Sequence, residues 1–319
     1  MSNSYLPLCI TLVASLAAWA PPEARAQPKP APATLRVVTI PVANQTALIV
    51  ARDKGYFAEE GLSVNWQTVN QGAVSVEAVY GGSAEFGATA VFEPMVARGN
   101  GLDVMFAVGA TRILKAPPDN SALVVRTQDS IKQASDLAGK KVSVGLINSV
   151  NYAHMLEWLG KYKVNPQSIQ FLEIPFPQMA DALFQNRLDA VWAVEPFLAF
   201  MLKSGKARII AYPYQETLPG MDITHYIAKE SWLKANPDLA RRFKRAMDKA
   251  TTLLINAPKA ERDGWVVKFT GMKPEVVAEM HLPEFTTQFN LASLKANLDI
   301  AVKHKMVKPF DINTMIWKP

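Results

Sequence analysis

Two stretches of the sequence, Val91-Phe92-Glu93-Pro94 and Ala193-Val194-Glu195-Pro196, repeat one short pattern. Each follows a short apolar segment and runs into an apolar stretch that ends in glycine. Proline favours the first turn of a helix, because its missing N–H would be unpaired there in any case. Both copies therefore predict a strand, a tight turn and the start of a helix. Such a repeat indicates two similar α/β lobes with a ligand groove between them.

The rest of the chain supports this organisation. From Leu35 onward, strand-like and helix-like periodicities alternate, which is typical of α/β sheets covered by helices. Two breaks, Pro117–Asn120 and Pro213–Gly220, flank a middle α/β unit, which indicates one lobe inserted into another. We expect lobe 1 at residues 35–118 and 221–319, and lobe 2 at 119–220, each with a mainly parallel sheet. The two crossings between the lobes would act as a hinge.

Composition narrows the class of protein. The 319 residues are 49% hydrophobic and 19% charged, which favours a globular chain with a substantial core. The net charge is +6, but the basic residues of Arg241–Arg245 would spread around a helix rather than form a patch. We therefore expect no nucleic-acid partner.

The N-terminus reads as a secretory signal peptide over residues 1–26, with an apolar run from Tyr5 to Ala20 and a small-x-small site at Ala24-Arg25-Ala26. Residues 27–34 are expected to form a flexible leader. Cys9, the only cysteine, lies in the apolar run. The exported chain would therefore contain no thiol, which excludes disulfides, thiol nucleophiles and cysteine metal sites.

Several motifs carry a resemblance to a known family. They are Ala51-Arg52-Asp53-Lys54-Gly55-Tyr56-Phe57-Ala58-Glu59-Glu60-Gly61-Leu62, Asp136-Leu137-Ala138-Gly139-Lys140-Lys141-Val142 and Trp232-Leu233-Lys234-Ala235-Asn236-Pro237. The chain resembles the periplasmic solute-binding proteins of ABC transporters, in the branch for nitrate, sulfonates, taurine and thiamine pyrimidine precursors. The resemblance implies a two-lobed, type II Venus-flytrap fold. It also implies a monomer in the periplasm that delivers a small molecule to a membrane permease with a cytoplasmic ATPase.

Candidate ligand-binding residues lie where helices begin after strands. Ligands of open α/β sheets bind at that edge, and the unpaired N–H groups of helix N-termini favour anions. Four such turns supply Asn44, Gln45, Thr46, Gly72, Thr89, Phe92, Ser149, Asn151 and Tyr152. The turn at Ser149 is the best anion-binding candidate, because either Ser149 or Asn151 can cap the helix while neighbouring N–H groups face the groove. Helix capping by Asn44 and core packing of Phe92 are the alternatives for those residues.

Three more candidates are Trp192, Glu195 and His225. Trp192 forms either a wall of the pocket or part of the lobe core. Glu195 either accepts a hydrogen bond from a ligand or stabilises the N-terminus of its own helix. For Glu93 in the first copy of the repeat, the helix role is favoured. His225 follows the second crossing and is either a polar contact in the cleft or a structural histidine.

These observations predict a binding protein for a small organic anion, either a sulfonate or a carboxylate. The candidate residues are also compatible with an anion that contains an aromatic ring. An aminopyrimidine precursor of thiamine is the alternative ligand. The alternative classes of protein are a ligand-presenting sensor and an enzyme that resembles the pyrimidine synthases of the same superfamily. The four histidines show no metal-ligand spacing, and no phosphate-binding or dinucleotide-binding motif is present. We therefore expect no catalytic residues, no metal and no cofactor.

Overall fold

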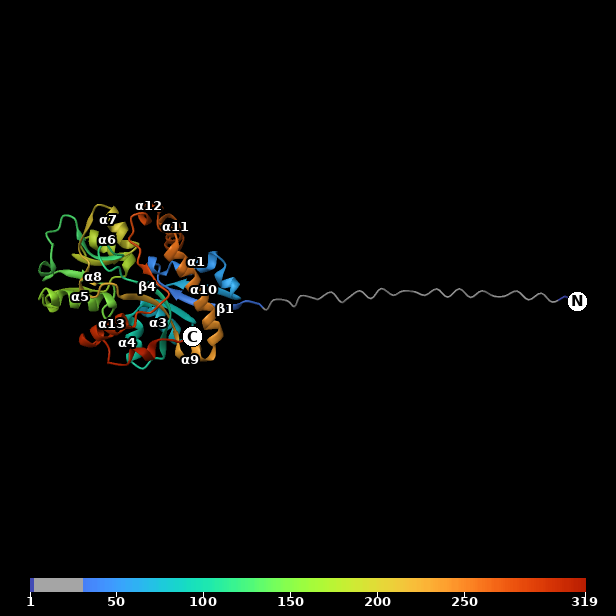
Figure 1. The fold of residues 1–319 in the computed structure, drawn as a ribbon. Helices are drawn as coiled ribbons and strands as arrows, with labels where there is room; N and C mark the ends of the chain where they lie inside the picture. Colours follow the sequence, from blue (N-terminus) through green and yellow to red (C-terminus); the bar gives the residue numbers. More distant parts are fainter. Residues whose placement is uncertain (3–30) are drawn as a thin grey trace. The chain divides into compact units, whose positions relative to one another are not determined.

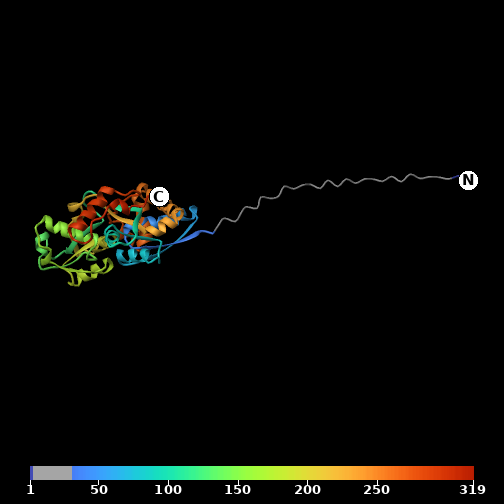
Figure 2. The same ribbon diagram turned by 90° about the horizontal axis from the view of Figure 1, so that it is seen from below.

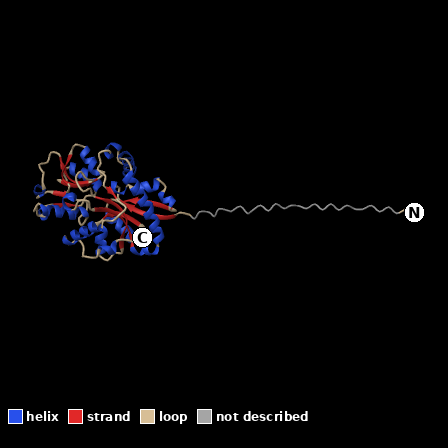
Figure 3. Ribbon diagram, in the orientation of Figure 1, coloured by secondary structure: helices blue, strands red, loops and turns tan. Residues whose placement is uncertain are grey.

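In the computed structural model, the strands of the described residues, 1–2 and 31–319, form two separate sheets. Residues 32–319 make up one compact unit, in which the strands lie inside and the helices outside (Figure 3). In both Figure 1 and Figure 2, the green and yellow middle segment occupies one end of this unit. The predicted signal peptide falls outside the described residues apart from its first two positions. Strand β1 already begins at Ala33, so the predicted leader extends two residues too far.

The first sheet has the strand order β11-β4-β10-β3-β1-β2. Its strands are β1 (Ala33–Thr39), β2 (Leu62–Thr68), β3 (Phe86–Ala90), β4 (Val104–Arg112), β10 (Asp222–Lys229) and β11 (Glu284–Phe285). β1 pairs in parallel with β2 and β3, whereas β10 runs antiparallel to both β3 and β4. Strands β1 to β4 therefore point the same way, and their carboxyl ends meet at one edge.

The second sheet has the order β7-β6-β8-β5-β9. Its strands are β5 (Ser121–Arg126), β6 (Lys141–Ser143), β7 (Gln170–Leu172), β8 (Ala190–Val194) and β9 (Ala207–Ala211). β6 is parallel to β7 and β8, but β5 is antiparallel to β8 and β9. Most strands of each sheet thus share a direction, as predicted, yet the sheets are mixed. β5 and β10 run antiparallel to their neighbours because each is the first strand after the chain crosses from the other sheet. The chain enters each sheet at the edge that holds the carboxyl ends of the neighbouring strands.

Helices cover both faces of each sheet. The longer ones are α1 (Ala47–Asp53), α3 (Gly72–Tyr80), α4 (Phe92–Gly99), α5 (Val150–Lys161), α6 (Phe176–Phe184), α7 (Phe197–Lys203), α10 (Pro237–Asn256), α11 (Lys259–Thr270) and α13 (Leu291–Lys303). The shorter ones are α2 (Tyr56–Glu59), α8 (Pro213–Thr217), α9 (Glu230–Ala235) and α12 (Pro274–Val277), with 3₁₀ turns at Ala43–Gln45, Ala134–Leu137, Pro166–Ser168 and Ile312–Met315. Among the helices described, none has the length and apolar character needed to cross a membrane.

The alternation of side chains along the strands explains the layers. In β10, Tyr226 packs with α1 and α10 on one face, and Ile227 packs with α3, α4 and α13 on the other. In β5, Val124 packs with α6 and α7, and Leu123 packs with α5. Successive residues of a strand point to opposite faces, so each strand contributes to two apolar layers. The layer that contains α5 and α13 continues from one sheet to the other.

The chain crosses between the sheets at residues 113–120 and 212–221, and the two segments lie side by side. The Ile113 N–H donates to the Met221 carbonyl oxygen over 2.8 Å. The Gln215 side chain in α8 donates to the Leu114 carbonyl oxygen, at 3.2 Å, and to the Asp119 carboxylate. Burial raises the pKa of Asp119. The two crossings are thus joined to each other by hydrogen bonds beside the edge where the sheets face each other.

The structure corrects one expectation about helix capping. Asn44 does not cap a helix, because it lies inside the 3₁₀ turn and its side chain contacts Thr111 and Asn120 instead. Asn236 likewise precedes α10 without a side-chain capping bond, and Pro237 occupies the first turn of that helix.

Candidate functional site

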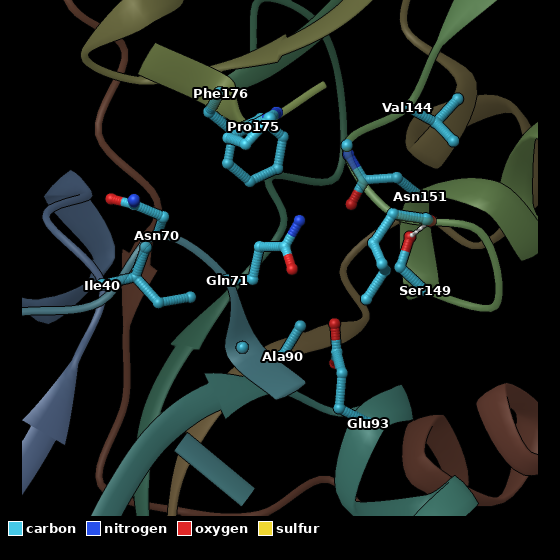
Figure 4. Close-up of a pocket in the computed structure, with 13 residues that line it drawn as sticks. Ile40, Asn70, Gln71, Ala90, Glu93, Val144, Ser149, Asn151, Pro175 and Phe176 are labelled. Atoms are coloured by element: carbon cyan, nitrogen blue, oxygen red, sulfur yellow. Dashed lines mark hydrogen bonds between the residues drawn. The ribbon is translucent and has the colours of Figure 1, made fainter. Parts of the chain in front are cut away.

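The carboxyl ends of β1, β2 and β3 face those of β6, β7 and β8 across a cleft made of two adjoining cavities. The first cavity has an empty volume of about 460 Å³, including space open to solvent, and is lined by Ile40, Asn70, Gln71, Gly72, Ala90, Glu93, Val144, Gly145, Leu146, Ser149, Asn151, Pro175 and Phe176 (Figure 4). The second has an empty volume of about 450 Å³, again including space open to solvent, and is lined by Ile40, Val42, Asn44, Ala90, Ile113, Asn120, Ser121, Val150, Asn151, Phe176, Val194, Tyr214, Ile223 and Thr224. Four residues belong to both linings, so the cavities form one continuous site.

The start of α5 forms one wall of both cavities. Ser149 is the N-cap residue of α5, and its Oγ accepts a hydrogen bond from the Tyr152 N–H over 3.3 Å. Asn148 just before it has a φ of 65°, a left-handed conformation that asparagine tolerates better than most residues. Of the two caps that the sequence allowed, Ser149 and Asn151, the structure has Ser149. The first N–H groups of α5 have no partner four residues earlier, and they lie at the cleft.

The polar atoms of the cleft belong mainly to amides and hydroxyls. Buried atoms with no hydrogen-bond partner among the described residues include Asn120 Oδ1, Ser121 Oγ and Asn151 Nδ2. The other polar atom of Asn151, Oδ1, accepts from the Tyr214 hydroxyl at 2.8 Å, which fixes the orientation of its amide. No lysine, arginine or histidine lines either cavity. Buried polar atoms are normally paired, so these three can bond a bound molecule.

Glu93 supplies the only carboxyl group of the two linings. It lies in the first turn of α4 and projects into the first cavity between Gln71 and the start of α5 (Figure 4). Burial raises its pKa to about 7, against the smaller opposing effects of its own N–H and the Thr89 hydroxyl. Its Oε2 is buried and has no hydrogen-bond partner in the described part of the chain.

Four of the twelve predicted site residues line the cleft: Asn44, Gly72, Ser149 and Asn151. Asn44 joins the two sides, because its amide donates to Thr111 Oγ1 at 2.9 Å and accepts from the Asn120 amide at 3.2 Å. The space beside the Gly72 backbone is occupied by another side chain of the protein. A Cβ at Gly72 would lie 2.4 Å from the Thr89 hydroxyl oxygen. The missing side chain of Gly72 therefore makes room for Thr89, which was not expected.

Four other candidates from the first lobe are buried away from both cavities. Gln45 and Thr46 are inaccessible to solvent, and the Thr46 hydroxyl donates to the Ala43 carbonyl oxygen over 2.8 Å. Thr89 is buried against Gly72. Phe92 belongs to the apolar core, with its ring centroid 6.1 Å from that of His154, so it takes the core role that was its alternative.

The remaining four candidates also lie outside the linings. Trp192 is fully buried with its ring centroid 4.6 Å from that of Tyr214. Tyr152 packs edge-on against Phe171. His225 is buried, with Nε2 3.1 Å from Asp222 Oδ2 and Nδ1 accepting from the Ala110 N–H at 3.3 Å. It takes the structural role.

Glu195 caps its own helix. Its Oε2 accepts from the Ala199 N–H at 3.0 Å in the first turn of α7, and its Oε1 accepts from the His281 N–H at 3.4 Å. Burial raises the pKa of Glu195 to about 8. Glu93 therefore lines the cleft, against the helix role favoured for it from sequence, whereas Glu195 takes the helix role that was one of its two alternatives.

Several lining residues were not among the twelve. Phe176 forms the wall opposite Glu93 in Figure 4, and Tyr214, Asn120 and Ser121 line the second cavity. Phe176 begins α6 in the short connection that follows β7, so the rule that sites follow strand ends could have found it. Asn120 and Ser121 lie where the chain crosses between the sheets, and their burial depends on the packing of both sheets.

This arrangement, two mixed α/β sheets joined by paired crossings around a polar cleft, is the fold of periplasmic binding proteins. The alkanesulfonate-binding protein SsuA from Xanthomonas axonopodis pv. citri, solved bound to MOPS, is similar with a TM-score of 0.75 and 18% identity, over 90% of this chain and 99% of that one. The family model described as "NMT1/THI5 like" matches residues 42–261, which is more than half of the sequence. The chain belongs to this family, which confirms the resemblance.

Two relatives of this chain show that related proteins differ in function. The taurine-binding periplasmic protein of Escherichia coli K12 is 22% identical over 69% of this chain and 68% of its own length. The 4-amino-5-hydroxymethyl-2-methylpyrimidine phosphate synthase THI11 of Saccharomyces cerevisiae is 21% identical over 68% of this chain and 65% of its own length. The relatives thus include both binding proteins and an enzyme.

Proposed function

We propose that this protein is the exported solute-binding component of an ABC importer. It captures a small organic monoanion, a sulfonate or a carboxylate, and delivers it to a membrane permease that works with a cytoplasmic ATPase. The observation that carries the proposal is the capped N-terminus of α5 at a cleft with unpaired amide and hydroxyl groups. The names of the relatives, taurine-binding and alkanesulfonate-binding, support the class of ligand.

The chemistry of the lining favours a monoanion with an apolar body. The N–H groups of the α5 first turn and the Asn151 amide would hold the charged head, because helix N-termini stabilise anions without a cation. Ile40, Val144 and Phe176 provide the apolar surface for the rest of the molecule. A dianion is disfavoured because no cationic side chain lines the cleft to neutralise a second charge.

The proposal includes closure of two lobes around the ligand. Lobe 1 comprises residues 35–118 and 221–319, lobe 2 comprises residues 119–220, and the two crossings form the hinge. Bringing the lobes together would allow the ligand to form hydrogen bonds with the buried polar atoms of Asn120, Ser121 and Asn151 that lack a partner among the described residues. This closed form is the one that a permease would recognise in the periplasm.

A second candidate ligand is an aminopyrimidine. The observation that favours it is the unpaired carboxyl of Glu93, which matches an amino group better than an anion. We propose binding rather than catalysis in this case too. The only cysteine, Cys9, lies in the proposed signal peptide, so the exported chain would have no thiol for catalysis.

A ligand screen by thermal unfolding tests the proposal. The panel contains alkyl and aryl sulfonates, aromatic carboxylates, nitrate and aminopyrimidines, in buffers free of sulfonic acids. A ligand at 100 times its dissociation constant adds about 2.7 kcal/mol to the free energy of unfolding, which is readily measured. Stabilisation by sulfonates or carboxylates supports the proposal, and stabilisation by aminopyrimidines alone supports the second candidate. If no compound binds to protein freed of bound molecules by unfolding and refolding, the proposed ligand classes are wrong.

A further inference from the structure

The carboxyl of Glu93 is the one group of the cleft that the anion-binding proposal leaves unexplained. It lies in the same cavity as Ser149 and Asn151, and it projects into that cavity from the opposite lobe (Figure 4). Its Oε2 is buried without a partner among the described residues. A buried carboxyl oxygen without a hydrogen-bond partner is unfavourable, and the Thr89 hydroxyl beside this carboxyl compensates only in part. A ligand that supplies the missing hydrogen-bond donor to this carboxyl oxygen would therefore stabilise the folded protein.

The surroundings of Glu93 limit what that donor is. The protein groups next to the carboxyl are Thr89 and the backbone at Gly72, where the absent side chain leaves a Cβ position 3.4 Å from Oε1. No basic side chain lines this cavity or the adjoining hollow, which is lined by parts of α3, α4 and residues 146–148. The described part of the chain therefore lines neither space with a cation for Glu93, and the carboxyl projects into the ligand space (Figure 4).

We infer that Glu93 is a specificity-determining residue that binds an amino or ammonium group of the ligand. This inference rests on the proposed function, because it takes the anionic head of the ligand to lie at the start of α5. The ligand class is then a small molecule with an anionic head at one end and an N–H donor at the other. A carboxylate that pairs with such a donor compensates for its burial, whereas a ligand with a methyl group in that place leaves Glu93 unpaired.

The other titratable groups near this carboxyl are a tyrosine and a glutamate. Burial raises the pKa of the Tyr214 hydroxyl, in α8, and the nearby charge of Glu93 raises it further. That hydroxyl already donates to Asn151 Oδ1, so it is not free to serve Glu93. Glu77, in α3, lines the adjoining hollow and is exposed. Neither group supplies the positive partner that Glu93 lacks.

Matched pairs of sulfonates test the inference. Taurine and ethanesulfonate share the sulfonate and differ at the terminal amine, and so do 3-aminopropanesulfonate and propanesulfonate. Affinities are measured by titration calorimetry at pH 7.5 for the wild-type protein, Glu93→Gln and Glu77→Gln. We expect the wild type to bind one or both amino compounds about tenfold to a hundredfold more tightly than their unsubstituted partners, as hydrogen bonds to charged groups would produce.

The variants separate the possible outcomes. Glu93→Gln should reduce the preference for the amine to less than about threefold, while Glu77→Gln, which removes the same charge from an exposed position, should preserve it. Equal binding of both members of each pair by the wild type would overturn the inference and leave the proposed function standing. So would a preference that survives in Glu93→Gln. If none of the four sulfonates binds the wild type, the inference fails, and the proposed function fails with it only if the aryl sulfonates and aromatic carboxylates of the thermal-unfolding panel do not bind either.

Discussion

Replacing Glu93 by glutamine should stabilise the ligand-free protein at neutral and alkaline pH. Burial raises the pKa of this carboxyl from 4.5 to about 7, so the folded protein binds more protons than the unfolded chain between those values. Stability is therefore lost as the pH rises through this window. A rise of this size corresponds to about 3 kcal/mol of unfolding free energy once Glu93 is ionised. Glutamine has nearly the same shape and does not ionise, so it removes this loss.

The measurement is urea unfolding followed by circular dichroism, for wild type and Glu93→Gln, at pH values from 5 to 8.5. Acetate, phosphate and borate are suitable buffers, because sulfonic-acid buffers resemble the proposed ligands. The gain in unfolding free energy of the variant should grow by about 2 to 3 kcal/mol from pH 5 to pH 8. Glu77→Gln, at an exposed site on α3, is the control for the loss of one charge and should show no such growth. A variant-minus-wild-type difference that stays constant with pH would refute the account of Glu93.

Four further predictions test the placement of other residues. Ser149→Ala removes the cap of α5, which should cost about 1 kcal/mol of stability in urea unfolding and weaken sulfonate binding in calorimetry; unchanged values in both would contradict its role. Gly72→Ala places a Cβ 2.4 Å from the Thr89 hydroxyl, so it should lower the melting temperature, and adding Thr89→Ala should recover part of the loss. Phe92→Ala should cost about 3 to 5 kcal/mol in urea unfolding, as expected for a core residue and not for a ligand contact alone. Burial lowers the pKa of His154 to about 4, so NMR should show its ring neutral with no titration between pH 5.5 and 8, and an observed midpoint in that range would contradict this.

The sequence determined the features that depend on near neighbours. Each copy of the repeat is a strand followed by a helix start, as predicted, because strand periodicity and the position of proline are local properties. Ser149 caps α5 for the same reason, since a cap needs only a hydroxyl at the correct residue and an N–H three residues later. The place of the site at the carboxyl ends of the strands also follows from chain direction alone.

Only the tertiary structure decided which side chains reach that site. Glu93 and Glu195 occupy equivalent places in the repeat, yet Glu195 accepts from the His281 N–H, 86 residues away, while Glu93 Oε2 has no donor among the residues that the structure describes. Asn44 is held by Thr111 and Asn120 rather than by its own helix. The burial and partners of a side chain are set by segments that are distant in the sequence and brought together by folding. Local pattern therefore predicts where the cleft lies, whereas long-range packing selects the residues that line it.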